Sequence, residues 1–297
     1  MSDHSVSRGG REGRVETPAT NAGASDDARL ALAGGARPRR FGAWYVAEHR
    51  LRVMWSYGQT IIATGFGEPL IYLYAMGVGL ATLVDQNLGA EAAGVGYLVY
   101  VAPALLCSAG LTTATIEFSY PVLLGYKWNP TFSGIHSGPI RPGQIVDGLV
   151  ISVVIRLAAT MAVYFAFMLL FGAVPSATGW LAILVATLTG MAFGTLLMAY
   201  ASTIREDTGQ LAMVERLIVL PLTLFSGTFF PLSELPWFLQ WIGWLSPLWH
   251  GTELARVLTF GYPEPIWLTA LHVVVLVAMT AVGWVWSRRI AFRRLTA

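Results

Sequence analysis

The sequence predicts an all-α integral membrane protein with six transmembrane helices. Hydrophobic residues make up 55% of its 297 residues and charged residues 12%, whereas soluble domains contain roughly 25% charged residues. The mean hydropathy of +0.58 indicates the same class. Each predicted span has about the 20 apolar residues that a helix needs to cross the hydrocarbon layer. The six predicted spans are Gln59–Leu80, Gly96–Tyr120, Val146–Gly172, Trp180–Thr203, Leu211–Phe230 and Ile266–Ser287.

Two segments precede the first span, and they differ in composition. Residues 1–36 are polar and rich in small residues, so they cannot bury enough apolar surface to fold, and we expect a disordered tail. Residues 37–297 are expected to form one membrane domain. Its first part, Phe41–Ser56, has an apolar stripe that predicts an interfacial helix on the membrane surface, although the stripe also fits the first turns of span one. The stripe consists of Trp44, Ala47, Leu51, Met54 and Trp55.

The positions of the basic residues predict the orientation of the chain. Cytoplasmic loops of membrane proteins carry an excess of Lys and Arg. Basic residues gather here before span one, between spans two and three, between spans four and five, and after span six. The connections after spans one and three carry no basic residue, and the connection after span five has Arg256 against Glu234, Glu253 and Glu264. We therefore expect a multi-pass protein of the plasma (inner) membrane with both termini in the cytoplasm.

Several functional classes find no support in the sequence. A phosphate-binding loop needs a Gly-Lys-Ser/Thr run, and the only lysine, Lys127, lies between Tyr126 and Trp128. The net charge of +2 gives no basic stripe for nucleic acid. Cys107 is the only cysteine, and the histidines are scattered without metal-binding spacing. The chain itself is therefore expected to bind no nucleic acid, cofactor or metal and to carry no catalytic residue.

The connection between spans two and three contains a short predicted helix. Asn129 is a suitable N-cap, Pro130 suits the first helical position, and a later Gly-Pro pair would end the helix after about two turns. Apolar side chains exposed on such a loop need a cover, which is either a partner protein or the bilayer surface. The candidate docking residues are Lys127, Trp128, Asn129, Pro130, Phe132, Ile135 and His136.

Three ionisable residues lie within or near the predicted spans. Ionisable residues inside the hydrocarbon layer are costly, so Glu68, Glu117 and Arg156 are candidates either for function or for a structural ion pair. Glu68 and Arg156 lie at similar distances from the expected cytoplasmic ends of their spans, roughly 14–15 Å at the helical rise. The sequence therefore favours Glu68 as the partner of Arg156, with Glu117 as the second choice.

A GxxxG pattern, Gly190 to Gly194, lies within the fourth span. Such a pattern lets two helix backbones approach closely. We expect it to pack against another helix of the same chain rather than to form a dimer contact.

The segment after the fifth span is too interrupted for a spanning helix and too apolar for an exposed loop. Prolines break it repeatedly, and its tryptophans suit the head-group level of a bilayer. We expect the fifth span to end near Phe230 and a re-entrant hairpin to follow, with a loop on the membrane surface as the alternative. The hairpin residues are Pro231, Glu234, Pro236, Trp237, Trp241, Trp244 and Pro247.

Several motifs resemble those of type-2 ABC exporter permeases. FSGTFFPLSELP and PLWHGTELAR, around and after the end of span five, resemble the branch of nodulation lipo-oligosaccharide and daunorubicin-type drug exporters. EPLIYLYAMGVGL in span one, and EFSY and PIRPGQIVDG around the loop helix, are similar to the same branch. The run KWNP departs from it, because relatives more often carry a basic run without proline there. The resemblance extends from about Arg39 to the end of the sequence.

The resemblance implies a permease subunit of an ATP-driven exporter. It implies that the short helix after span two couples to a separately encoded ABC ATPase, which would hold ATP and Mg. It also implies a second permease copy in a homodimer or heterodimer, contact with membrane lipids, and an amphipathic substrate such as a glycolipid or lipophilic drug. A lipid-modifying membrane enzyme and a membrane scaffold protein remain the alternatives.

Overall fold

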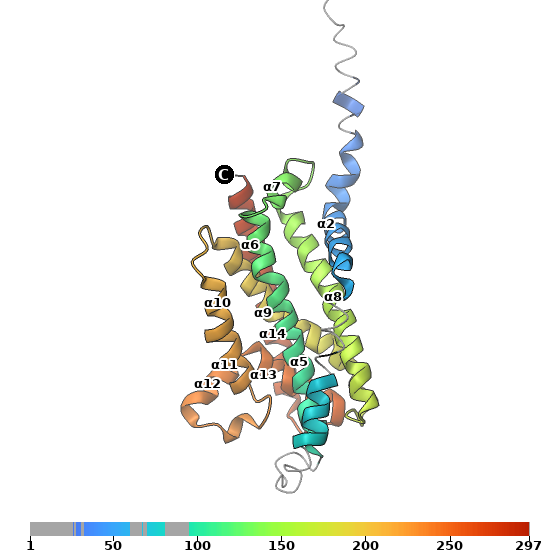
Figure 1. Cartoon of the computed structure of the whole chain (residues 1–297), viewed down its shortest axis with the longest axis vertical. Coiled ribbons are helices and arrows are strands. Elements are labelled where there is room, and N and C mark those ends of the chain that lie inside the picture. The colour runs from blue at the N-terminus through green and yellow to red at the C-terminus, as the bar shows by residue number, and fades with distance from the viewer. Residues whose placement is uncertain are drawn as a thin grey trace, which may run out of the picture.

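The computed structural model describes residues 26, 28–30, 33–59, 67, 70–80 and 95–296, which form a bundle of helices with no strand among them (Figure 1). The elements with assigned bounds are α2 (Ala36–Ser56), η1 (Ala75–Leu80), α5 (Tyr97–Phe118), α6 (Tyr120–Tyr126), α7 (Thr131–His136), α8 (Pro142–Leu170), η3 (Gly179–Leu181), α9 (Ala182–Thr203), α10 (Gln210–Val214), η4 (Glu215–Val219), α11 (Leu220–Phe225), η5 (Leu232–Glu234), α12 (Trp237–Leu245), α13 (Pro247–Phe260) and α14 (Ile266–Leu295).

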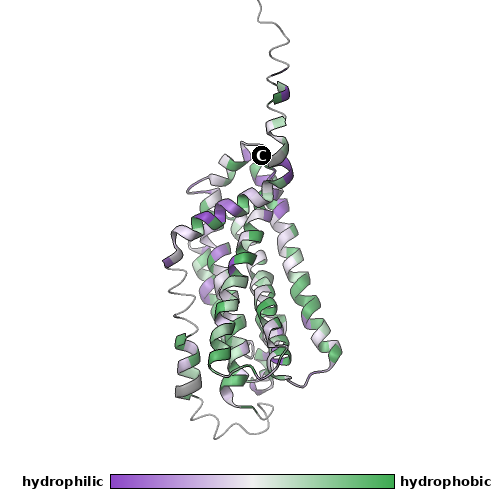
Figure 2. Ribbon diagram, turned by 90° about the vertical axis from the view of Figure 1, so that its right-hand side faces the viewer, coloured by the Kyte–Doolittle hydropathy of each residue, from purple (hydrophilic) through white to green (hydrophobic). Residues whose placement is uncertain are grey.

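The bundle has two distinct ends (Figure 1). One end carries α7 and the C-terminal end of α14, and we call it the α7 end. The opposite end carries α12, and we call it the α12 end. Figure 2 shows hydrophobic residues along the long helices and hydrophilic residues gathered toward the α7 end.

Four helical segments of the described residues are long and apolar enough to cross a membrane. They correspond to the second, third, fourth and sixth predicted spans. Residues 60–66, 68 and 69 of the first predicted span lie outside the described residues, as does most of the tail 1–36, so the count of six spans stays a prediction. The four segments are Tyr97–Tyr126, Pro142–Leu170, Gly179–Thr203 and Ile266–Leu295.

Helix α9 is the central element and packs against α5, α8, α13 and α14. Its glycines allow close approach, because a Cβ added to Gly190 would lie 2.5 Å from the carbonyl oxygen of Gly110 on α5. A Cβ at Gly194 would lie 2.6 Å from the Phe118 ring on the same neighbour. The prediction that this GxxxG packs within the chain is confirmed.

Helix α2 packs along α8. Gly148 of α8 accommodates Val46, since a Cβ there would lie 2.5 Å from the Val46 side chain. Of the predicted apolar stripe, Ala47 and Met54 are buried, whereas Trp44 and Trp55 are 51% and 85% exposed. The packed face of α2 is set by α8 rather than by hydrophobicity alone. The position of α2 on a membrane surface stays a prediction.

The fifth predicted span is shorter than expected. Its helical run, α10–η4–α11, ends at Phe225, five residues before the predicted Phe230. The middle part is π-helical. Ser226–Phe230 is irregular, and Gly227 has a φ of 71°, a left-handed conformation that suits glycine. The chain therefore leaves this helix earlier than its hydrophobicity indicates, at the first Ser-Gly pair.

The segment after α11 forms two helices that differ in burial. Helix α12 exposes its aromatic side chains, with Trp237 83%, Trp241 54% and Trp244 56% exposed. Helix α13 is largely buried and packs against α5, α9 and α14. The prolines begin these elements rather than interrupting them, as proline does at the start of helices. Pro231 precedes η5, Pro236 precedes α12, and Pro247 is the first residue of α13. Insertion of this hairpin into a bilayer stays a prediction.

Candidate functional site

The predicted docking helix exists as α7, but its contacts differ from expectation. Phe132 is only 4% exposed, so it is not presented to a partner. Its ring lies edge-on to Tyr126 with 4.8 Å between ring centroids. A Cβ added to Gly125 would lie 2.4 Å from the same ring, so α6 needs a glycine there. Phe132 therefore anchors α7 to α6.

The ends of α7 also differ slightly from the sequence prediction. The helix begins at Thr131 with Pro130 as its N-cap, one residue later than the predicted cap at Asn129. A backbone turn replaces side-chain capping, since the Asn129 N–H donates to the Leu124 carbonyl at 3.0 Å. After the helix, the His136 Nδ1 lies 3.1 Å from the Ile140 carbonyl oxygen, so Nδ1 carries the proton.

The outward surface of the α7 region consists of other residues. Lys127 and Asn129 are exposed, and Ile135 and His136 are half-buried. Trp128 is 51% exposed, and its ring stacks on the Tyr120 ring with 6.4 Å between the ring centroids. Gly134 faces open space, because an added Cβ there would meet nothing within 4 Å. Trp128 and Gly134 are therefore the open positions of this region, and Phe132 anchors α7 on its buried side.

Glu117 of α5 lies between two arginines on different helices. Its Oε1 contacts the Arg156 Nη1 from α8, and its Oε2 accepts from the Arg50 Nη2 of α2 at 3.1 Å. The sequence favoured Glu68 as the partner of Arg156, whereas the structure gives that place to Glu117, the second choice. Glu68 itself lies outside the described residues. Arg50, which lies in the predicted interfacial helix Phe41–Ser56 but outside its apolar stripe, is the partner that the sequence analysis missed.

This charge cluster, Arg50–Glu117–Arg156, is incompletely paired among the described residues. The Nε atoms of both arginines are buried without a hydrogen-bond partner. Burial lowers the pKa of Arg50, which lies outside the four spanning helices, and the nearby Glu117 opposes that shift. The arginine side chains are 20% and 18% exposed, so neither is fully enclosed by the protein. The cluster joins α2, α5 and α8 but leaves hydrogen-bonding capacity unused.

A second charged centre lies around Arg256 of α13. The guanidinium donates from Nη1 to Glu253 at 2.8 Å, from Nη2 to the Gly227 carbonyl at 2.8 Å, and from Nε to the Tyr100 carbonyl at 3.2 Å. It also lies 3.8 Å from the centroid of the Tyr100 ring, within cation–π distance. Arg256 is 1% exposed. It therefore fixes α13 to α5 and to the irregular segment after α11.

Two histidines that are distant in sequence meet beside this centre. The Nδ1 atoms of His250 and His272 lie 2.6 Å apart. The His250 Nε2 contacts the Trp244 carbonyl at 3.1 Å, so this nitrogen carries the proton and the His250 Nδ1 accepts from His272. The His272 Nε2 contacts the Glu264 carboxylate at 2.9 Å. Their spacing in the sequence did not reveal this contact, because His250 and His272 lie on different helices, α13 and α14.

This histidine chain is closed to solvent and uses all its nitrogens internally. His272 is completely buried and His250 is 5% exposed. Burial, and secondly His272, lowers the pKa of His250 on α13 from 6.5 to about 4, so its imidazole is neutral at pH 7. No group of three or more His, Cys, Asp or Glu within the described part of the chain could hold a metal ion.

Comparison with known proteins identifies a matching protein family and several similar proteins. Residues 43–260 match the family model described as ABC-2 type transporter. "Nodulation protein J" of Rhizobium leguminosarum bv. trifolii is 28% identical over 247 residues, covering 80% of this chain and 87% of the relative. The protein of that name from Rhizobium leguminosarum bv. viciae is 27% identical over 259 residues, covering 85% and 95%. That from Rhizobium meliloti (strain 1021) is 26% identical over 241 residues, covering 79% and 86%.

Proposed function

This chain belongs to the ABC-2 type transporter family, and we propose that it is the membrane-spanning permease subunit of an ATP-driven exporter. The family match and the apolar helices make it an integral membrane component of a transporter rather than an enzyme. Members of this family normally work with an ABC ATPase. The chain's one lysine is not part of a phosphate-binding loop, which supports a separate subunit holding ATP and Mg.

The ATPase would dock at the α7 end, which we propose faces the cytoplasm. Arg288, Arg289, Arg293 and Arg294 at the end of α14 support this orientation through the positive-inside tendency. The observation that carries the proposal is the anchored helix α7, held from behind by Phe132 while Trp128 and Gly134 face outward. A force applied to that face would pass through α6 into α5. The permease acts as a dimer in this proposal, with a second copy or a related chain.

The proposed substrate is amphipathic. Helix α12, at the end that would face outward, exposes Trp237, Trp241 and Trp244, and such rings interact with both an apolar chain and a polar head group. The relatives are named nodulation proteins, and the motif resemblance is to lipo-oligosaccharide and drug exporters. A lipid-linked saccharide is therefore preferred to a lipophilic drug.

Docking is tested by placing a charge on the open face of α7. A Gly134→Glu variant should fold normally, since the added side chain enters open space, but should lose ATPase binding and stimulated hydrolysis. Measurements are co-purification, ATP hydrolysis and thermal unfolding of the chain co-expressed with its ATPase. Thr208→Glu, an exposed substitution in the loop after α9, is the matched control.

A second variant separates docking from the anchoring of α7. Gly125→Ala should lower stability, because its methyl group would overlap the Phe132 ring. Normal coupling in Gly134→Glu, or ATP hydrolysis by the purified chain alone, would contradict the proposal. For the substrate, a deletion strain should accumulate one surface glycolipid inside the cell. Normal glycolipid export together with sensitivity to a lipophilic antibiotic would favour the drug instead.

The histidine chain does not favour the alternative of a lipid-modifying enzyme. His250, His272 and Glu264 do converge, as an acid–base site would require. Their contacts are internal, however, and His272 is fully buried, so no nitrogen is free to reach a substrate. Their arrangement fits a structural link between α13 and α14.

A further inference from the structure

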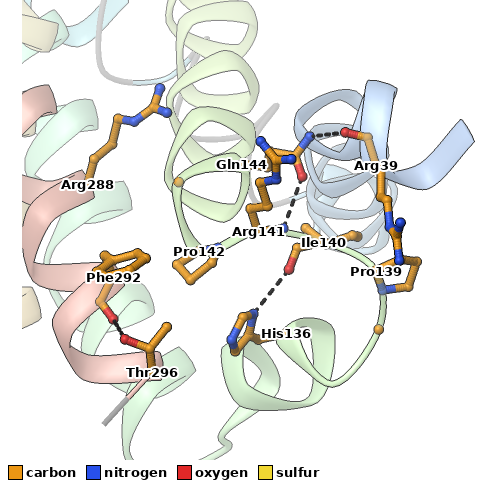
Figure 3. A pocket seen from close by; sticks show the side chains of 12 residues that line it. Arg39, His136, Pro139, Ile140, Arg141, Pro142, Gln144, Arg288, Phe292 and Thr296 are labelled. Atoms are coloured by element: carbon orange, nitrogen blue, oxygen red, sulfur yellow. Dashed lines mark hydrogen bonds between the residues drawn. The ribbon is translucent and has the colours of Figure 1, made fainter. Parts of the chain in front are cut away.

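A cavity of about 750 Å³ lies at the α7 end, where α2, the segment after α7, the start of α8 and the end of α14 meet (Figure 3). One wall comes from the start of α2, which the Gln144 side chain holds by donating to the Arg39 carbonyl at 2.9 Å. The opposite wall comes from the last turns of α14. The cavity therefore lies at the same end of two predicted membrane-spanning helices, α8 and α14.

Three arginines from three different elements line this cavity: Arg39, Arg141 and Arg288. Arg288 is already paired, because its Nη1 lies 2.9 Å from both oxygens of Asp147. No carboxylate among the described residues forms an ion pair with Arg39 or Arg141, and both residues are exposed. No described residue that lines the cavity is acidic, and Asp147, the partner of Arg288, is the neighbouring carboxylate. The site thus carries unneutralised positive charge.

The rest of the lining is apolar. Phe292 of α14 is 60% exposed on the same wall as Arg288, and Pro139, Ile140 and Pro142 form the side nearest α7. A site for a free anion would need only the charged groups. An apolar wall next to arginines matches a ligand that has a phosphate joined to a hydrocarbon-bearing part.

We propose that this cavity binds the phosphate head group of an anionic phospholipid from the adjoining leaflet. Guanidinium groups match phosphate oxygens in charge and geometry. Basic pockets between spanning helices on the cytoplasmic side suit anionic head groups, and the lipid glycerol and first methylenes would lie against Phe292. The inference depends on the proposed orientation of the α7 end but not on ATP hydrolysis or transport.

The test uses the purified full chain in detergent, with phosphatidylglycerol and phosphatidylcholine as probes and retained lipid measured by native mass spectrometry. The wild type should retain phosphatidylglycerol in preference to phosphatidylcholine. The double variant Arg39→Gln with Arg141→Gln should lose phosphatidylglycerol affinity on the order of 10- to 30-fold. Arg205→Gln removes an exposed arginine from the loop after α9 and should behave as wild type. Phe292→Ala should weaken both lipids.

Any one of the following results would overturn the proposal. Equal retention of the two lipids by the wild type, or unchanged retention by the double variant, would show that the cavity does not select an anionic head group. Full displacement of the lipid by millimolar inorganic phosphate would show a site for the free anion. Loss of ATPase co-purification in the double variant, with phosphatidylglycerol retention intact, would assign the arginines to the partner protein. Failure of ATP-driven export alone would leave the lipid measurements unaffected.

Discussion

The Arg256 centre and the Arg50–Glu117–Arg156 cluster differ in how completely their buried guanidinium groups are hydrogen-bonded. At the Arg256 centre every guanidinium nitrogen has an acceptor, and the side chain is 1% exposed. At the charge cluster near α2, two guanidiniums share Glu117, and the Nε atoms of Arg50 and Arg156 have no partner among the described residues. Those arginine side chains are 20% and 18% exposed. The guanidinium of Arg256 is fully hydrogen-bonded and enclosed by protein. The guanidiniums of Arg50 and Arg156 are only partly hydrogen-bonded within the described residues and are partly exposed.

The difference separates a fixed contact from an adaptable one. Moving α13 away from α5 would break several charge-assisted hydrogen bonds with no water to replace them, so that contact is expected to stay closed. The Arg50–Glu117–Arg156 cluster can exchange partners or take up water at lower cost. It joins α2, α5 and α8, and of these helices α8 also packs against α7, the proposed ATPase docking helix. We therefore expect motion at the α2 contact and rigidity at the α13 contact.

The largest expected effect comes from breaking the Arg256 centre. Arg256→Met would leave Glu253 as a buried carboxylate without its partner, together with the carbonyls of Tyr100 and Gly227. Removing one member of a buried ion pair costs about 3–5 kcal/mol, so the yield of monodisperse protein should fall sharply. Size-exclusion yield and thermal unfolding in detergent measure this, with Arg205→Met as the exposed control. A variant as stable as wild type would show that Arg256 is not a structural anchor.

The charge cluster should respond with a smaller, coupled effect. Glu117→Gln leaves both Arg50 and Arg156 uncompensated, and Arg156→Gln leaves Arg50 to neutralise Glu117. Their double variant should be less damaging than the sum, with a coupling energy of about 0.5–3 kcal/mol in thermal or chemical unfolding. The same cycle with Glu68→Gln and Arg156→Gln should be additive. Coupling to Glu68 with none to Glu117 would restore the pairing that the sequence favoured.

The smallest expected effect concerns the histidine chain beside the Arg256 centre. The folded-state pKa of His250 is lowered to about 4 from 6.5, so below pH 6.5 the unfolded chain takes up a proton that the folded chain does not. Stability should therefore fall as the pH is lowered from 6.5 toward 4, because a charged His250 would face the Nδ1–H of His272. A His250→Gln variant should lose part of this dependence in unfolding measurements at a series of pH values. Identical pH profiles would assign the dependence to His272, Glu264 or other groups.

The sequence by itself determined the class, the family and most of the spans. Long apolar runs leave few alternatives to spanning helices, because backbone polar groups in hydrocarbon must be satisfied within the segment. The matched residues 43–260 confirm the resemblance that the motifs indicated. Proline and glycine marked the breaks after the fifth helical segment, although its helix ended earlier than expected, at Phe225.

Only the tertiary structure decided which polar groups meet. Arg50 lies far in sequence from Glu117, and His250 and His272 sit on different helices, so no spacing rule could pair them. Phe132 looked like an exposed docking residue because the glycine that receives its ring, Gly125, is on the preceding helix. The hydrophobic pattern of a helix can be read from its own sequence. The partner of a buried charge depends instead on which side chains two crossing helices bring within hydrogen-bond distance.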